Sequence, residues 1–170
     1  LADLIRERNP SPDVFEAAAL GETELLAKLL PETPAGAQAV APDGFGLLGL
    51  AVYFGRYEAA ELLLKEGAHP DTSSANAFKV RPIHSAAAHR DPATSHELVR
   101  LLLEWKADPN VVQAGGWMPL HQAAAHGRED TAKLLLEHGA SLTAKSDDGR
   151  TPLEMARAKG HDGLEAVLGG

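Results

Sequence analysis

Cysteine is absent from this 170-residue chain, which excludes disulfide bonds, thiolate metal ligands and cysteine nucleophiles. A chain without cysteine is compatible with both reducing and oxidising compartments, so the compartment stays open. Aromatic residues make up only 5% of the sequence. No apolar run approaches the ~20 residues of a membrane-spanning helix, because Lys, Glu or Gly interrupts every leucine cluster. We therefore expect a soluble protein with no membrane partner.

Positive charge is also scarce. The chain has 16 Lys and Arg against 24 Asp and Glu, for a formal net charge of −8. Nucleic-acid binders usually carry a basic face, so we expect no nucleic-acid partner. The length suffices for one core, which predicts a single domain without a separate catalytic module. The first residue is Leu1 and not Met, so whether the chain is full length is left open.

What the sequence does contain is internal repetition. A leucine-rich segment that ends in alanine occurs at 62–68, 101–107 and 134–140. A second element, clearest at 118–127, precedes it and is echoed at 81–89. The step from Ala107 to Ala140 is 33 residues, whereas the step from Ala68 to Ala107 is 39. A period of this size is typical of stacked helical repeats.

The residues of one repeat predict two helices and a turn. Pro119 occupies a position where proline starts a helix, with φ preset and no hydrogen-bond donor lost. Ala123 and Ala124 provide a small-residue face, and the following leucines at 134–136 provide a broad apolar stripe. Gly139 stands where a left-handed residue ends the second helix. Two helices that bury one another are therefore expected in each copy.

These motifs resemble the ankyrin repeat family. The match is carried by Thr151-Pro152-Leu153, Pro119-Leu120-His121, Gly139-Ala140 and Ala107-Asp108-Pro109-Asn110. The resemblance implies an all-α solenoid of stacked helix-turn-helix units with β-hairpin fingers between the repeats. It also implies a non-catalytic scaffold that needs no cofactor.

We expect about five units, of which the first and last are degenerate caps. In the second unit Gly46-Leu47-Leu48-Gly49 replaces Thr-Pro-Leu-His. In the third, an insertion at 90–93 is expected between the two helices and, with a slightly longer finger, explains the 39-residue step. The expected division is an N-terminal helix at 1–12, a cap repeat and linker at 13–42, repeats at 43–75, 76–112 and 113–145, and a C-terminal cap repeat at 146–170.

The histidines invite a metal hypothesis, since His84 and His89 recur one repeat later as His121 and His126. A spacing of five does not place two ligands on one helical face, and no carboxylate shares the pattern. His84 and His121 instead resemble the family histidine that hydrogen-bonds main chain near the helix start, which leaves His89 and His126 exposed. Residues 147–149 suggest an ordinary turn, because they lack the EF-hand spacing for calcium. We predict no metal site, no cofactor-binding site and no catalytic residues.

The resemblance implies a partner-binding surface formed by finger tips and the exposed ends of the first helices, on the concave face of the stack. The residues that map there are Phe45, Tyr53, Phe54, Phe78, Val80, Trp117 and His126. Phe45, Phe54 or Phe78 could instead pack between repeats, and this alternative stays open. Trp117 is the preferred anchor, because its position does not require a large residue and exposed aromatics are typical of interfaces.

The expected function is to bind another protein as a monomer. An alternative is an accessory or targeting domain of a larger, possibly enzymatic, protein, and a further alternative is a small-molecule or metal binder. Lys106 stands where other copies have Gly67 and Gly139, so we also expect it to adopt the left-handed backbone conformation.

Overall fold

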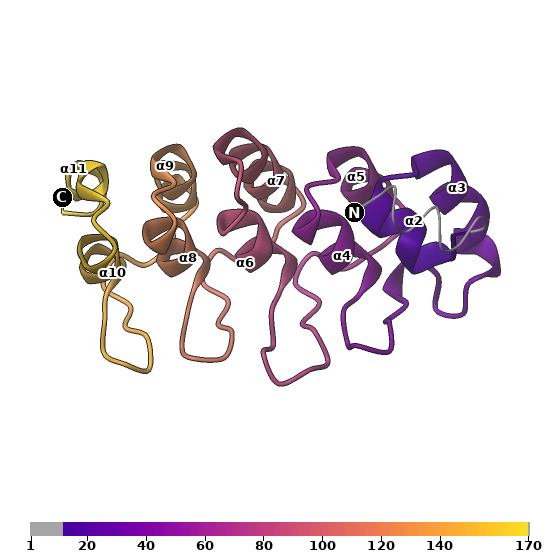
Figure 1. Cartoon of the computed structure of the whole chain (residues 1–170), viewed down its shortest axis with the longest axis horizontal. Coiled ribbons are helices and arrows are strands. Elements are labelled where there is room, and N and C mark those ends of the chain that lie inside the picture. The colour runs from indigo at the N-terminus through magenta and orange to yellow at the C-terminus, as the bar shows by residue number, and fades with distance from the viewer. Residues whose placement is uncertain (1–11, 170) are drawn as a thin grey trace.

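The chain forms a row of helix pairs with loops projecting from one side (Figure 1). The computed structural model describes residues 12–169, so the N-terminal helix expected within 1–12 lies almost entirely outside the described residues. The first helix of each pair, called inner here, is α2 (Val14–Leu20), α4 (Leu47–Tyr53), α6 (Pro82–Ala87), α8 (Pro119–Ala125) or α10 (Pro152–Ala158). The second, outer helix is α3 (Thr23–Leu29), α5 (Tyr57–Lys65), α7 (Pro92–Glu104), α9 (Glu129–Glu137) or α11 (Glu165–Leu168).

Each pair packs mainly on the next pair along the row. Inner helices contact inner helices, as α4 does with α2 and α6, and outer helices contact outer helices. The helix pairs fall one each within the segments 13–42, 43–75, 76–112, 113–145 and 146–170. The result is an elongated stack whose core runs from pair to pair, and the all-α solenoid predicted from the sequence is confirmed.

The core is built from the two kinds of residue that recur in each repeat, alanine and leucine. Fully buried alanines such as Ala123 and Ala124 let the inner helices approach closely. Fully buried leucines such as Leu102 and Leu135 fill the space between inner and outer helices. Burying one such leucine contributes roughly 1.5–3 kcal/mol to the free energy of unfolding.

The helix boundaries agree with the predicted start and stop signals. Pro119 and Pro152 are the first residues of α8 and α10. Gly67 and Gly139 lie two residues beyond α5 and α9 with φ of 91° and 87°, values that glycine adopts without steric cost. Lys106 takes the corresponding place after α7 with φ of 68°, so its predicted left-handed conformation is confirmed.

One expectation about the connections is wrong. Only Arg90 and Asp91 of the insertion lie between the helices, because Asp91 caps α7 and Pro92 is its first residue. The extra residues therefore lengthen α7 by about one turn relative to α9. The linker at 31–42 also contains local helical structure, namely the short 3-10 helices η1 (Leu30–Glu32) and η2 (Gly36–Gln38), as does the loop before α11 with η3 (Asp162–Leu164).

We use the name fingers for the loops that join one outer helix to the next inner helix, at 31–46, 66–81, 105–118 and 138–151. They project together below the helices in Figure 1. β-Hairpin fingers were expected; in the described residues two of the fingers each hold a single antiparallel bridge, Val40 to Gly46 in one and Gln113 to Trp117 in the other. Side-chain turns also occur in the fingers, as where Ser146 Oγ donates to the main-chain oxygen of Arg150 at 3.0 Å.

Candidate functional site

The histidines of the helix-start motif bond to main chain on both ring nitrogens. His84 Nδ1 accepts a hydrogen bond from the Arg81 N–H at 3.2 Å, and its Nε2 lies 3.1 Å from the main-chain oxygens of Val111 and Trp117. This pattern requires the neutral tautomer that carries its proton on Nε2. His84 therefore fastens the start of α6 to the following finger.

His121 repeats the arrangement one unit later. Its Nδ1 accepts from the Met118 N–H at 3.2 Å, and its Nε2 donates to the main-chain oxygen of Arg150 at 3.1 Å. The predicted structural role of His84 and His121 is confirmed. Neither ring has a lone pair left for a metal ion, because one nitrogen accepts and the other donates.

Burial controls the protonation of these rings. His84 is 1% exposed, and desolvation lowers its pKa to about 4. Desolvation likewise lowers the pKa of His121. Both side chains therefore stay neutral at neutral pH, as their hydrogen bonds require.

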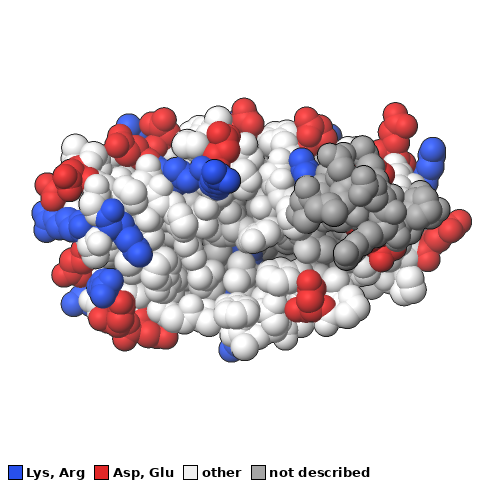
Figure 2. All heavy atoms as spheres, in the orientation of Figure 1, with Lys and Arg blue, Asp and Glu red and all other residues white. Residues whose placement is uncertain are grey.

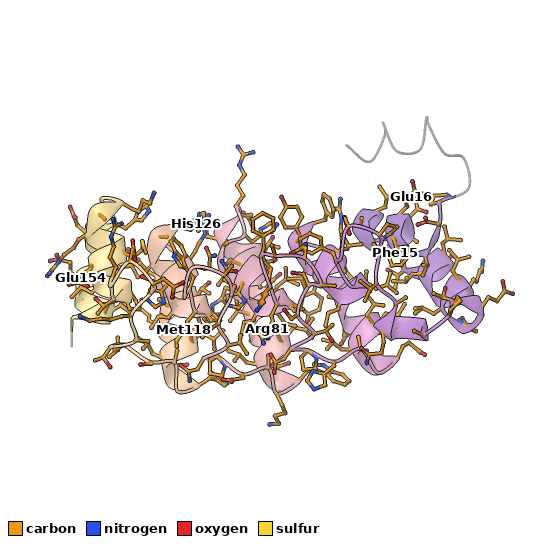
Figure 3. The ribbon with its side chains drawn as sticks, turned by 90° about the horizontal axis from the view of Figure 1, so that it is seen from below. Phe15, Glu16, Arg81, Met118, His126 and Glu154 are labelled. Atoms are coloured by element: carbon orange, nitrogen blue, oxygen red, sulfur yellow. The ribbon has the colours of Figure 1, made fainter. Side chains whose placement is uncertain are left out.

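In the first and last repeats a carboxylate, in place of a histidine, accepts the main-chain hydrogen bond at the start of the inner helix. Glu154 Oε2 accepts from the Thr151 N–H at 2.8 Å, and Glu16 accepts from the Asp13 N–H at 3.0 Å. Hydrogen bonds from Thr151 hold the pKa of Glu154 below its usual range. Figure 3 shows Arg81, Met118 and Glu154 near the starts of successive inner helices. The second repeat lacks such a group, because Gly49 occupies the equivalent position in α4.

Side chains beyond the inner helices link the second, fourth and fifth repeats to the repeat before each. Arg56 Nε donates to the Ala19 main-chain oxygen at 3.0 Å, and Arg128 Nε donates to that of His89 at 3.0 Å. His161 Nε2 lies 3.1 Å from the Ala125 main-chain oxygen. Sequence reasoning missed these links, although each residue follows the end of an inner helix at a fixed offset. They fix the spacing of neighbouring inner helices.

The fingers are also connected from repeat to repeat. The Ala75 N–H donates to the Gly44 oxygen at 2.8 Å, the Ala114 N–H to the Phe78 oxygen at 2.9 Å and the Asp147 N–H to the Gly115 oxygen at 2.9 Å. These bonds make the fingers one continuous surface beside the inner helices. We call this surface, with the exposed ends of the inner helices, the concave face.

The concave face contains an open hollow of about 420 Å³ over the second to fourth repeats. Apolar walls come from Phe45, Tyr53, Val80 and Ala88, and polar groups come from His89, Arg90, Gln113 and Gln122. A hollow with apolar walls and a few polar groups is suited to receive one large side chain.

The structure brings together three of the predicted partner-binding residues, Phe45, Tyr53 and Val80, in this hollow. Tyr53 is 61% exposed, and its ring meets Phe54 edge to face at 5.1 Å between centroids. Phe78, in the next finger, is 66% exposed. The suggestion that Phe78 packs between repeats is thus wrong, whereas Phe45 and Phe54 are partly buried.

Trp117 departs from the prediction of a freely exposed anchor. Its side chain is half-buried and packs against the core, with its ring centroid 6.5 Å from that of His121. The cause is local, because the bridge to Gln113 and the Trp117 main-chain contact to His84 turn this finger back onto α8. His126 is exposed as expected, but His89 is half-buried and packs over Gly55.

Within residues 12–169 no three His, Cys, Asp or Glu side chains come together as a metal site. The 147–149 segment forms the predicted turn, closed by Ser146 N–H and Arg150 oxygen at 3.0 Å. None of the helices in the described part of the chain is long and apolar enough to cross a membrane.

The fold and its motifs define a class, the ankyrin repeat proteins. The model of the ankyrin repeat family in three copies matches residues 14–113 and 83–169. The chain belongs to this family, whose repeats generally act as protein-interaction modules and are typically non-catalytic.

The relatives that share the repeats are named as very different kinds of protein. The chain is 43% identical over 65 residues to the 2-5A-dependent ribonuclease of Homo sapiens, covering 38% of this chain and 9% of the relative. It is 35% identical over 77 residues to the protein phosphatase 1 regulatory subunit 27 of Homo sapiens, covering 45% and 50%. It is 33% identical over 72 residues to the potassium channel AKT1 of Oryza sativa subsp. japonica, covering 42% and 8%. The aligned part of the chain thus spans half or less of the length of these relatives, and the similarity concerns the repeats.

Proposed function

We propose that this chain binds a partner protein through its concave face and has no catalytic activity of its own. The observation that carries the proposal is the exposure of Tyr53 and Phe78, at 61% and 66%, beside the hollow that Phe45 and Val80 help to line. Exposed aromatic side chains around an apolar hollow are typical of interface anchors. The proposed binding residues remain Phe45, Tyr53, Phe54, Phe78, Val80, Trp117 and His126.

The residues of this surface differ in how cleanly they can be tested. Tyr53 and Phe78 contribute little to the core, so their truncation reports on binding. Trp117 packs against the core, so its truncation lowers both stability and affinity. The core of the stack lies within one chain, and we propose that the chain is a monomer.

The test is to replace Tyr53 and Phe78 by alanine and to measure affinity for the partner together with the melting temperature. We expect each change to weaken binding about tenfold or more while the melting temperature stays nearly constant. Trp105→Ala is the matched control. Trp105 is also an aromatic side chain, 39% exposed, but it lies at the C-terminal end of the outer helix α7 and not on the inner helices. Equal loss of affinity in all three variants, or in none, would contradict the concave face as the binding surface.

A second proposal is that these repeats serve as an accessory or targeting region of a longer protein. It is favoured by relatives in which the similar stretch occupies only 8% or 9% of the chain. Determining the complete reading frame tests it. A reading frame without any further folded domain would contradict this second proposal and leave the first untouched.

A further inference from the structure

Three segments of the concave face, which run from the fingers through the inner helices of the internal repeats, contain no acidic residue, and Asp43, Asp71 and Asp108 of the fingers lie directly before them. These segments are 44–57, 72–90 and 109–128, and all 24 Asp and Glu of the chain lie elsewhere. The same segments contain the basic residues Arg56, Lys79, Arg81, Arg90 and Arg128. These three segments therefore carry only positive charge in a chain whose net charge is −8.

The acidic residues next to these segments accept hydrogen bonds from nearby main-chain N–H groups. Asp43 accepts a hydrogen bond from the Phe45 N–H at 3.1 Å, Asp91 from the Thr94 N–H at 2.8 Å and Asp108 from the Asn110 N–H at 2.8 Å. These carboxylates form turns and caps at the borders of the concave face.

The basic groups differ in how near they lie to a carboxylate, because Arg81 interacts electrostatically with Asp71 and Arg128 with Asp91. Within the described residues, no ion pair joins any of these five side chains to a carboxylate. Arg56, Arg81 and Arg128 donate to main-chain oxygens, which carry no net charge. Arg90 is exposed at the rim of the hollow, and Lys79 is exposed in the finger beside it. The pKa of His126 is lowered first by burial and then by the positive charges of Arg128, His161 and Lys159, which agrees with a positive surrounding.

A second hollow, of about 480 Å³, lies at the starts of α7 and α9 and is lined by Glu97, Glu129 and Asp130 together with Arg128. Figure 2 shows the face in the orientation of Figure 1, with red and some blue side chains along the edge formed by the outer helices, a largely white middle, and further red side chains among the fingers below. Three carboxylates thus face one arginine, Arg128, in the second hollow, whereas the hollow on the concave face has Arg90 and no carboxylate in its lining, beside the aromatic walls Phe45 and Tyr53.

We propose that the concave face of the three internal repeats binds an acidic segment of its partner protein, with a large apolar side chain seated between Tyr53, Phe45 and Val80 and with carboxylates facing Arg90 and Lys79. This inference rests on the proposed function and specifies the chemistry of the partner. A guanidinium forms paired hydrogen bonds with a carboxylate, which favours Arg90 as the main contact. The 24 carboxylates elsewhere on the chain oppose a long phosphate backbone, so a peptide and not a nucleic acid is assigned.

The experiment is a selection of random 16-residue peptides displayed on phage against the immobilised chain, followed by fluorescence anisotropy with the selected peptides. We expect enrichment of sequences that place Asp or Glu next to Leu, Phe or Trp. Arg90→Glu should weaken binding at least about tenfold, and raising the salt concentration should weaken it several-fold.

Arg100→Glu is the matched control, because it makes the same change of charge on the outer helix α7, where Arg100 is exposed and pairs with Glu104. Affinity that falls equally in both variants would overturn the proposal. So would selected peptides that are basic, or a single-stranded oligonucleotide that binds more tightly than the peptides and depends on Arg90. Peptides without acidic residues whose binding needs Tyr53 but not Arg90 would overturn the acidic specificity while supporting the concave face as a protein-binding surface.

Discussion

Asn110 reaches from the third repeat to the fourth, where its side-chain nitrogen donates a hydrogen bond of 2.9 Å to the main-chain oxygen of Gly139. Its side-chain oxygen accepts a second bond of 2.9 Å from the Ser141 N–H. One amide side chain thus satisfies a donor and an acceptor in the loop that follows α9. Gln38 makes a related contact between earlier repeats, donating to the Gly67 oxygen at 2.6 Å.

Replacing Asn110 by alanine should lower the free energy of unfolding by about 1–2 kcal/mol, because two hydrogen bonds between repeats are lost. Urea denaturation followed by circular dichroism measures this change. Asn110→Asp keeps the acceptor for Ser141 but turns a carboxylate oxygen, which cannot donate, towards the Gly139 oxygen, so it should destabilise the protein at least as much as alanine does. If alanine and aspartate were equally harmless, the contact would add nothing to the stack.

Lys106→Gly should stabilise the protein by about 1 kcal/mol. Lys106 has a φ of 68°, and a residue with a Cβ adopts this region at a cost of roughly 1 kcal/mol that glycine does not incur. Thermal melting provides the measurement. The reciprocal change Gly139→Lys should destabilise by a similar amount, since Gly139 has a φ of 87° and its Cβ position is open. A lower melting temperature for Lys106→Gly would mean that the side chain of Lys106 outweighs its backbone strain.

Alanine should have opposite effects at Gly49 and Gly116. Gly49 lies within α4, where an added Cβ would come no closer than 3.9 Å to Phe45, so helix propensity predicts a gain of roughly 0.5–1 kcal/mol. Gly116 has a φ of 71°, and a Cβ there would lie 2.6 Å from the main-chain nitrogen of Asp147. Gly116→Ala should therefore force adjacent fingers apart and lower the midpoint of urea unfolding, whereas Gly49→Ala raises it. Midpoints that move in the same direction would show that the finger contact is not tight.

Stability should fall as the pH drops below the ordinary histidine pKa. The folded pKa of His84 is about 4, whereas an unfolded histidine titrates near its model value of 6.5. The unfolded chain therefore binds a proton that the folded chain rejects, and the stabilisation present above pH 6.5 is lost progressively as the pH falls towards 4. The lowered pKa of His121 acts in the same direction. For His84 the loss amounts to at most about 3 kcal/mol.

Urea unfolding at a series of pH values measures this dependence, and NMR titration of the imidazole protons assigns it. We expect the His84 resonance to remain in its neutral position down to about pH 5. A His84 resonance that titrates near 6.5 in the folded protein would disprove the neutral tautomer inferred from its contacts with Arg81 and Val111.

The sequence allowed the repeat and the helix starts to be predicted, because these depend on residues close together in one copy. The role of His84 and His121 was predicted from the family resemblance, since their bonds reach the following finger. The extra turn of α7 could have been predicted, since Asp91-Pro92 is a capping residue followed by a helix-starting proline. The half-burial of Trp117 could not, because it depends on how one finger turns back towards α8. The links from Arg56 and Arg128 join residues 37 and 39 positions apart, so they emerge only when neighbouring repeats stack.

The proposed basic character of the concave face, in a chain with a net charge of −8, would give the molecule an electric dipole. In the field of an acidic partner this dipole exerts a torque that turns the concave face towards the partner before contact. Productive encounters then become more frequent without any change in the bound contacts. Added salt should accordingly slow association and leave the lifetime of the complex almost unchanged.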